Sequence, residues 1–301
     1  MNTSDDTITY KYSNVPTKEE FDERFNSLIS EDYSTITIEE TINKIKNKLG
    51  PLPKIYRGTT SEMKFIRARK EKSIGENEDI CTINPFTYPK NQSSKNLRAN
   101  IKDKPVFYCS LSSVHTILKE IKSEINDIVY LSVWKKPKGI TIKKTLFLPT
   151  SLPSDNIYQP WIEEWVSEFK KGVIEGDAES LLYAVEKINE LFLHDNYELT
   201  SKIAHSSIYD YADLTDCIVY PSVAHNYKDL NIAIHPDYVD ENLILTNLLK
   251  VRVTNVEKPN MQILKCGEYD LKTKVITWST PRSKEELNNF LNDIDIGMNI
   301  L

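Results

Sequence analysis

Apolar residues recur at helical spacing in several stretches of the chain and crowd into short strand-like runs in others. Near the N-terminus, Thr17 and Glu20 have the spacing of a capping box, and Phe21, Phe25 and Leu28 follow at helical intervals. A second periodic segment runs from Ile38 to Leu49 and is followed by Gly50-Pro51, a helix stop signal. These patterns predict two helices, and therefore a helical extension over residues 1–52.

After residue 53 the pattern changes to short runs rich in β-branched and aromatic residues, bounded by Pro, Gly or Asp, which is typical of β-strands. We expect strands over residues 54–59, 105–110, 127–134, 141–148, 217–223, 230–236 and 248–256, followed by a hairpin in 261–280. Between residues 61 and 104 the chain is mostly polar, which predicts a long loop region.

Helical periodicity returns in the second half of the chain. A stripe from Val114 through Ile117 and Ile121 to Ile125 predicts a helix with Ser112 or Ser113 as its N-cap. Two further helices are expected over about 160–172 and 178–194, inside a helical insertion over about 155–196. Ser283 to Glu286 form a capping motif for a last helix, which closes a C-terminal region of strands and helix over about 245–301.

Helices and strands do not alternate regularly, so the sequence predicts an α+β fold with a mixed or antiparallel β core flanked by helices, in one domain over 53–301. Hydrophobic residues make up 40% and charged residues 27% of the 301 residues, which indicates a soluble globular protein. The net charge of −6 disfavours broad binding to nucleic acid, and the Lys-rich loop at 90–104 is interpreted as a solvated loop.

Cysteine usage and the N-terminus indicate a cytoplasmic location. Three of the four cysteines lie in apolar or strand-like contexts and no CxxC pair occurs, as expected for reduced thiols. The N-terminus resembles no secretory signal, and no apolar run approaches the length of a membrane span, so we expect no contact with a membrane.

Most familiar cofactor and metal motifs are missing from the sequence. The five histidines are scattered, without HExxH or paired Cys/His spacing, so no metal site is expected. No glycine pattern of a Rossmann or P-loop nucleotide site is present. A Cys–His hydrolase that uses Cys109 stays open, although Cys109 sits in an expected strand and can equally point into the core.

Six polar residues stand inside or beside apolar runs, where a polar side chain is least expected. They are Arg57, Arg98, Asn100, Tyr108, Glu120 and Ser222. Each one taken alone also fits an ordinary structural role: a solvated glutamate on a helix flank, a surface arginine or a turn serine.

Together, the segments that carry these residues resemble the RES domain. IYRGT, LRAN, PVFYCS, TILKE, YELTSKIA, TDCIVYPSV and LNIAIHP occur in the order of that family, over about residues 53–240. The resemblance implies an ADP-ribosyltransferase-like fold. It identifies Arg57, Glu120 and Ser222 with the arginine, glutamate and serine that name the family, and Tyr108 with the tyrosine that precedes the glutamate. Arg98 and Asn100 match a further family stretch.

The resemblance also implies a function: an NAD⁺-consuming toxin of a bacterial toxin–antitoxin pair, with NAD⁺ as substrate and no prosthetic group. Glu120 would stabilise the cation formed when the nicotinamide–ribose bond breaks, and Arg57 and Arg98 would bind phosphate oxygens. Tyr108 would stack on nicotinamide, and Ser222 would donate a hydrogen bond to the nicotinamide-side ribose or amide. Asn100 would also belong to the NAD⁺-binding residues. We therefore expect these side chains to converge on one cleft.

Several questions stay open at the level of sequence. Phosphorolysis, hydrolysis and transfer of ADP-ribose to a protein are not separated, and a non-catalytic binding module that keeps the fold is the alternative outside enzymes. The family leads us to expect a helix-turn-helix antitoxin as partner, and self-association into a homo-oligomer is not decided.

Overall fold

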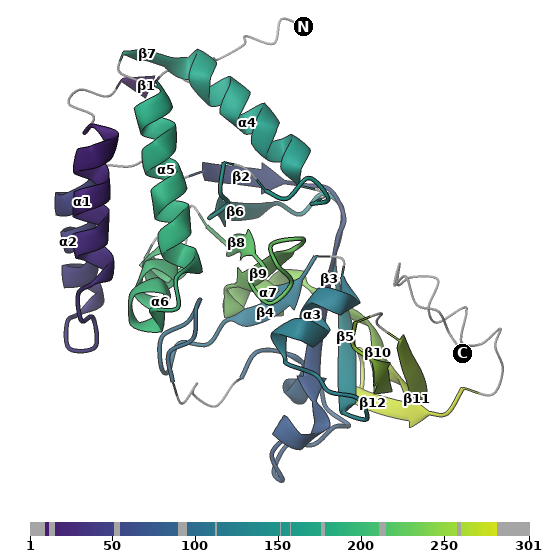
Figure 1. Ribbon diagram of the computed structural model, residues 1–301. Helices are drawn as coiled ribbons and strands as arrows, with labels where there is room; N and C mark the ends of the chain where they lie inside the picture. The colour runs from purple at the N-terminus through teal and green to yellow at the C-terminus, as the bar shows by residue number, and fades with distance from the viewer. Residues whose placement is uncertain are drawn as a thin grey trace, which may run out of the picture.

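The computed structural model places a long β-sheet at the centre of the molecule, with helices packed on both of its faces (Figure 1). It describes residues 10–11, 16–50, 55–89, 95–111, 113–150, 152–156, 158–175, 178–210, 215–257 and 260–281. The C-terminal helix expected after Ser283 lies outside these residues.

The central sheet has ten strands in the order β12-β11-β10-β5-β3-β4-β9-β8-β6-β2. Their bounds are β2 (Ile55–Thr59), β3 (Met63–Lys70), β4 (Phe107–Ser110), β5 (Ile128–Lys136), β6 (Ile142–Leu146), β8 (Cys217–Pro221), β9 (Leu230–Ile234), β10 (Ile244–Asn255), β11 (Asn260–Asp270) and β12 (Val275–Ser279). Every neighbouring pair is antiparallel except β6 and β8. A small parallel pair joins β1 (Tyr10–Lys11) to β7 (Val173–Glu175). The α+β prediction is confirmed.

The two N-terminal helices form as expected, as α1 (Lys18–Ile29) and α2 (Ile38–Leu49). Both begin with a complete capping box, at Thr17 and Thr37, which satisfies backbone N–H groups that the first helical turn leaves unpaired. After α2, Gly50 adopts a left-handed φ of 80°, a conformation that glycine reaches without steric cost. The buried face of α1 belongs to the same core as residues of α5, β8 and β9.

Residues 155–196 fold into the expected helices α4 (Gln159–Gly172) and α5 (Ala178–Leu193), and α6 (Tyr197–His205) follows directly. The two longer helices cover opposite faces of the sheet. Ile162 of α4 packs with Leu146 of β6, whereas Phe192 of α5 stacks on Phe147 and contacts Tyr220 of β8.

Alternation along the strands assigns side chains to these two faces. Register pairs Arg57 with Lys144, and Lys144 with Cys217, on the face that α4 covers. Tyr56, one position earlier, therefore shares the opposite face with Tyr108.

The prediction of a loop throughout 61–104 is wrong for residues 63–70, which form β3, paired on both sides. Met63 and Phe65 alternate on one face of this strand, and Ile66 and Ala68 on the other, but the basic residues between them gave the segment a polar composition. Sheet pairing decided the structure there, because the buried apolar positions stabilise the strand whatever its overall polarity.

The helix predicted to extend to Ile125 ends earlier, as α3 (Val114–Glu120). Lys122 adopts a left-handed φ of 51° and the N–H group of Ser123 donates to the carbonyl oxygen of Leu118, which closes the helix end. Ile125 is consequently 64% exposed and does not belong to the apolar stripe. A further short helix, α7 (Pro236–Asn242), follows β9 and was not expected.

Candidate functional site

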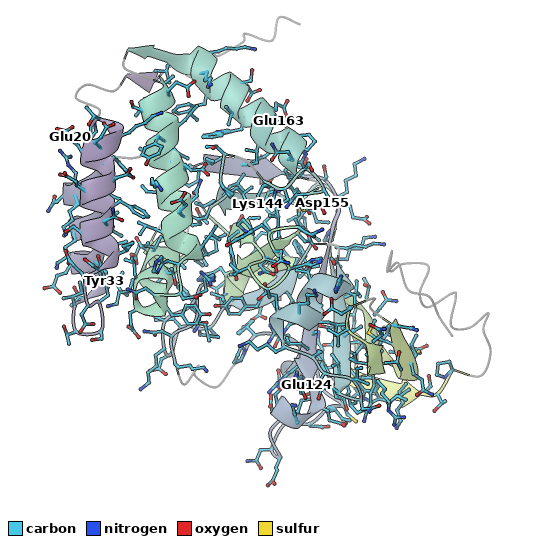
Figure 2. The ribbon with its side chains drawn as sticks, viewed as in Figure 1. Glu20, Tyr33, Glu124, Lys144, Asp155 and Glu163 are labelled. Atoms are coloured by element: carbon cyan, nitrogen blue, oxygen red, sulfur yellow. The ribbon has the colours of Figure 1, made fainter. Side chains whose placement is uncertain are left out.

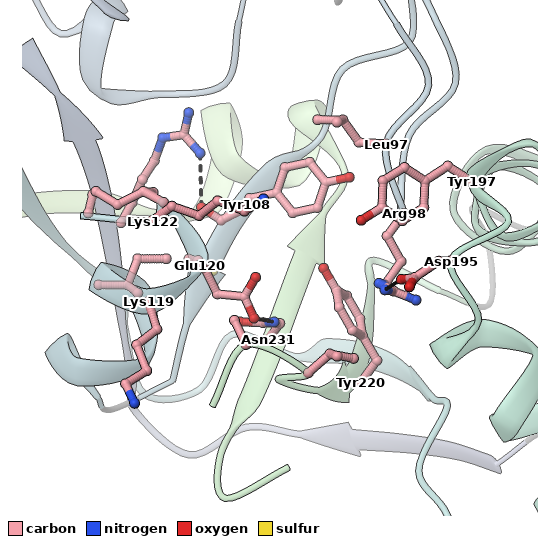
Figure 3. Close-up of a pocket in the computed structure, with 17 residues that line it drawn as sticks. Leu97, Arg98, Tyr108, Lys119, Glu120, Lys122, Asp195, Tyr197, Tyr220 and Asn231 are labelled. Carbon is pink, nitrogen blue, oxygen red and sulfur yellow. Dashed lines mark hydrogen bonds and ion pairs between the residues drawn. The ribbon is translucent and has the colours of Figure 1, made fainter. Parts of the chain in front are cut away.

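A cavity of about 480 Å³ opens where α3 crosses the central strands β3, β4 and β9 (Figure 3). Its wall includes side chains from seven separate segments of the chain. The polar and aromatic residues among them are Arg67, Arg98, Tyr108, Lys119, Glu120, Lys122, Asp195, Tyr197, Tyr220 and Asn231. A concave space of this volume is in the range of small-molecule sites, roughly 300–1,000 Å³.

Glu120 is the last residue of α3, and two buried side chains, one just after β8 and one on β9, hold its carboxylate. The Ser222 hydroxyl group donates to Oε1 at 2.6 Å, and the Asn231 amide donates to the same oxygen at 2.5 Å. Among the described residues none donates a hydrogen bond to Oε2. Figure 3 shows this oxygen directed away from Asn231 into the space beside Tyr220. One carboxylate oxygen is thus fixed and the other is available to a ligand.

Ser222 follows β8 directly and is completely buried, so it lies behind the cavity wall rather than in it. Its own backbone is anchored in the turn between β8 and β9, where Ser222 N–H donates to Asp229 and Tyr227 N–H donates to Ser222. The structure therefore has Ser222 donating to Glu120, where the sequence predicted donation to a substrate.

Tyr108 forms one side of the cavity, and its hydroxyl group is bound to the loop before β4. The hydroxyl donates to Asn100 Oδ1 at 2.9 Å and accepts from the N–H group of Ala99 at 2.9 Å. Burial raises the pKa of Tyr108, so the phenol stays protonated and can act as donor. Asn100 is only 3% exposed and positions the tyrosine ring without lining the cavity itself.

Tyr220 faces Tyr108 across the cavity from β8 and supplies a second ring. Burial also raises the pKa of its hydroxyl group. This hydroxyl has no hydrogen-bond partner in the part of the chain that the structure describes, and Figure 3 shows it pointing into the cavity. It can therefore donate a hydrogen bond to a ligand.

Arg98 connects the cavity rim to the helical insertion. Its guanidinium group donates to the carbonyl oxygens of Phe192 and His194, at 2.7 and 2.9 Å, and forms an ion pair with Asp195 at 3.2 Å. It also lies over the Tyr197 ring, 5.3 Å from its centroid. Much of its donor capacity is used inside the protein, so its position is set by the junction of α5 and α6.

The expectation that Arg57 joins this cleft is wrong. Arg57 lies on β2, at the far edge of the sheet, and on the face opposite to Tyr108. Its side chain is exposed and stacks on Trp161 of α4. The resemblance matched Arg57 by the order of its motif along the chain, and that order does not fix the face of the sheet on which a strand residue points.

Besides Arg98, a second arginine lines the cavity: Arg67 of β3, which the sequence analysis did not single out. β3 and β4 share a single bridge, between Ile66 and Ser110, so the carbonyl oxygen of Tyr108 beyond it is open and accepts from Arg67 Nη1 at 2.9 Å. Burial lowers the pKa of Arg67 to about 10, which leaves it charged at neutral pH. The sequence did carry a signal for this residue: Arg67 continues the alternation of Met63 and Phe65, where an apolar side chain would be expected.

The cavity thus combines the Glu120 carboxylate, the Arg67 guanidinium group and the facing rings of Tyr108 and Tyr220. Its wall also contains Lys119 and Lys122, and the group Arg98, Asp195 and Tyr197. Such a set suits a ligand that has both a positively charged centre and anionic groups. The part of the chain that the structure describes contains no group of three or more His, Cys, Asp or Glu side chains able to hold a metal ion. Within the same residues, no helix has the length and apolarity to cross a membrane.

Comparison with protein-family models, with curated proteins and with solved structures finds no match to this chain.

Proposed function

We propose that the chain is an enzyme that binds NAD⁺ in the cavity beneath α3 and breaks the nicotinamide–ribose bond. The observation that carries the proposal is the carboxylate of Glu120, with Oε1 held by Ser222 and Asn231 and Oε2 facing the cavity. The sequence resemblance to the RES domain supports the same reading, since Glu120, Ser222 and Tyr108 meet at one place.

NAD⁺ cleavage requires stabilisation of a cation that forms during the reaction. The C–N bond between ribose and nicotinamide breaks, its electron pair neutralises the pyridinium ring, and positive charge develops on the ribose. A fixed carboxylate near that carbon stabilises the developing charge and can accept a hydrogen bond from a ribose hydroxyl group. Water or phosphate then adds to the ribose carbon, which gives ADP-ribose or its 1-phosphate.

The remaining side chains have separate tasks in this proposal. Arg67 offers a charged, partly engaged guanidinium group to the pyrophosphate, the role that the resemblance implied for Arg57 and Arg98. The rings of Tyr108 and Tyr220 provide flat surfaces for nicotinamide, and the Tyr220 hydroxyl group supplies a donor. Asn100 and Ser222 hold Tyr108 and Glu120 in place.

The direct test is to incubate the purified chain with NAD⁺ and to measure free nicotinamide, in parallel with and without phosphate. Release that needs phosphate identifies phosphorolysis, and release without it identifies hydrolysis. Label transferred from NAD⁺ to protein identifies an ADP-ribosyltransferase instead. NAD⁺ that binds but is not consumed under any condition overturns the enzyme proposal in favour of a binding module.

The toxin reading requires a test in cells. Expression of the active chain in bacteria is expected to deplete NAD⁺ and stop growth, and the Glu120→Gln variant is expected to do neither. Growth arrest by both forms would separate toxicity from NAD⁺ cleavage.

A further inference from the structure

A second cavity of about 260 Å³ lies at the opposite end of the sheet, between β2, β6 and α4. Its apolar floor contains Ile55 and Leu146 from the strands and Ile162 from the helix, all buried. Trp161 forms part of the wall and is 38% exposed, which is high for so large a ring. The site is built from regular elements, so its shape is well defined.

Arg57 lines this cavity, and a second cationic side chain, Lys144 of β6, lies next to it at the same Trp161 ring, below α4 (Figure 2). Arg57 and Lys144 are directly opposite each other on β2 and β6 and point to the same face. The Arg57 guanidinium carbon is 4.8 Å and the Lys144 ammonium nitrogen 5.9 Å from the centroid of the same Trp161 ring. Neither side chain makes a hydrogen bond or an ion pair with any residue that the structure describes.

This arrangement is costly for the protein alone. Like charges directly opposite each other on a β-sheet destabilise it, and a mostly buried ammonium group without a counter-ion is disfavoured. Lys144 is only 4% exposed, and burial, together with Arg57, lowers its pKa. An anion placed between the two cations would remove both penalties.

The opposite wall of the cavity has different chemistry. Glu164 and Glu168 of α4 are one helical turn apart and line the space beside Trp165. Their carboxylates suit hydroxyl or amino groups and would repel a second anionic group. A ligand that uses every wall has a phosphate at one end, and a sugar and an amino-bearing planar ring at the other.

We propose that this α4 site binds a nucleoside monophosphate, with its phosphate between Arg57 and Lys144 and its sugar and base against Trp161 and the two glutamates. A phosphate offers several acceptor oxygens to the arginine fork and the lysine ammonium group. The space is roughly half that of the cavity beneath α3, which favours one nucleotide over a dinucleotide. The proposal does not depend on the NAD⁺ reaction.

The test titrates the full chain with AMP by calorimetry at low ionic strength, with inorganic phosphate and adenosine as separate ligands. Arg57→Gln is expected to weaken AMP binding at this site at least about tenfold, since a charge-assisted contact is lost. Arg252→Gln is the matched control, because it is the same substitution at an exposed strand position of β10. It is expected to bind AMP like the parent chain.

Because AMP could also enter the cavity beneath α3, the titration is repeated with Arg67→Gln. Loss of AMP binding in Arg67→Gln but not in Arg57→Gln would overturn the proposal, as would unchanged binding in both Arg57→Gln and Lys144→Met. Adenosine that binds as tightly as AMP would also overturn it, because the phosphate then contributes nothing. Inorganic phosphate that binds as tightly as AMP would overturn the nucleotide assignment, because the sugar and base then contribute nothing. If that binding is lost in Arg57→Gln, the α4 site is a site for free phosphate.

Discussion

Arg57 and Arg67 lie on β2 and β3, two strands that are consecutive in the sequence but not adjacent in the sheet. The environments of their side chains differ strongly. Arg67 is largely buried, donates to the backbone of Tyr108 and lines the cavity with Glu120. Arg57 is exposed, stacks on an indole ring and faces another cationic side chain. Each lies near an aromatic ring, Phe107 for Arg67 and Trp161 for Arg57.

The difference arises from the strands beside each arginine. β2 is paired with β6 along its full length, through five residue pairs, so Arg57 can only project from one face. β3 and β4 are joined at one pair and separate beyond it, which leaves room for the Arg67 side chain at the edge of β4. The two arginines therefore have different environments because β2 and β6 are hydrogen-bonded along the whole of β2, whereas β3 and β4 are joined at only one residue pair.

The proposed function makes the cavity lined by Arg67, and not the surroundings of Arg57, the catalytic site. The largest expected effect is therefore at Glu120, which lines the same cavity as Arg67. In Glu120→Gln the amide oxygen can still accept from Ser222 and Asn231, but the negative charge facing the cavity is lost. We expect kcat for nicotinamide release to fall roughly 10²–10³-fold with little change in KM, the usual cost of removing one electrostatic contact to a transition state.

The matched control is Glu124→Gln, which changes an exposed glutamate shortly after α3. It should keep the parent rate. A parent rate in a folded Glu120→Gln chain would show that Glu120 is only a structural residue.

The second effect separates the two arginines by the same substitution. Arg67→Gln removes a charge from the cavity, and we expect KM for NAD⁺ to rise about 10- to 100-fold, which corresponds to ~1.5–3 kcal/mol for a charged hydrogen bond. Arg57→Gln should leave KM and kcat for NAD⁺ unchanged. The reverse result, from steady-state kinetics on both variants, would place the pyrophosphate at β2.

The third effect compares two hydroxyl groups in the same cavity. Tyr108→Phe leaves Ala99 N–H and Asn100 Oδ1 without their partner, so we expect the free energy of unfolding to fall by about 1–3 kcal/mol. Tyr220→Phe removes a hydroxyl group without a partner in the described residues, so its stability should stay close to that of the parent chain. Urea unfolding of the two variants measures the difference, and equal losses would contradict the assigned hydrogen bonds.

The smallest effect concerns two histidines behind the cavity, His115 on α3 and His225 in the turn after β8, whose rings are 4.4 Å apart. Thr116 Oγ1 lies 2.8 Å from both His225 Nδ1 and Asp229 Oδ2. The hydroxyl proton goes to the Asp229 carboxylate, so His225 Nδ1 must carry its own proton. Charged side chains that influence the pair are Lys119, Asp155, Lys228, Asp229 and Glu257.

Burial lowers the pKa of both histidines below 6.5 in the folded chain. As pH falls below 6.5 the unfolded chain therefore binds more protons, and the free energy of unfolding decreases until the folded histidines are also protonated. His115→Gln should show a smaller decrease than the parent chain between about pH 7.5 and about pH 5. The exposed His194→Gln variant is the control, and an equally small decrease there would assign the effect to histidine number alone.

Much of the fold could be predicted from the sequence because the relevant signals are local. The capping boxes at Thr17 and Thr37 each need only four consecutive residues, and the hydrophobic pattern of α5 needs only its own sixteen. β3 escaped prediction because its burial depends on β5 and β4, which are distant in sequence. The end of α3 escaped because a left-handed lysine, rather than glycine, closes it.

The sequence by itself indicated where the helices begin and where most strands lie, because these signals are local. It also singled out Tyr108, Glu120 and Ser222 as candidates, since each stands in a short recognisable segment. Only the tertiary structure decided that Arg67 rather than Arg57 lines the cavity with Glu120, and that Asn231 and Ser222 donate to the same carboxylate oxygen. Alternation gives the face on which a side chain begins, but not which strands become neighbours or where two of them separate. Those are consequences of packing the whole sheet, and the position of Arg67 depends on them.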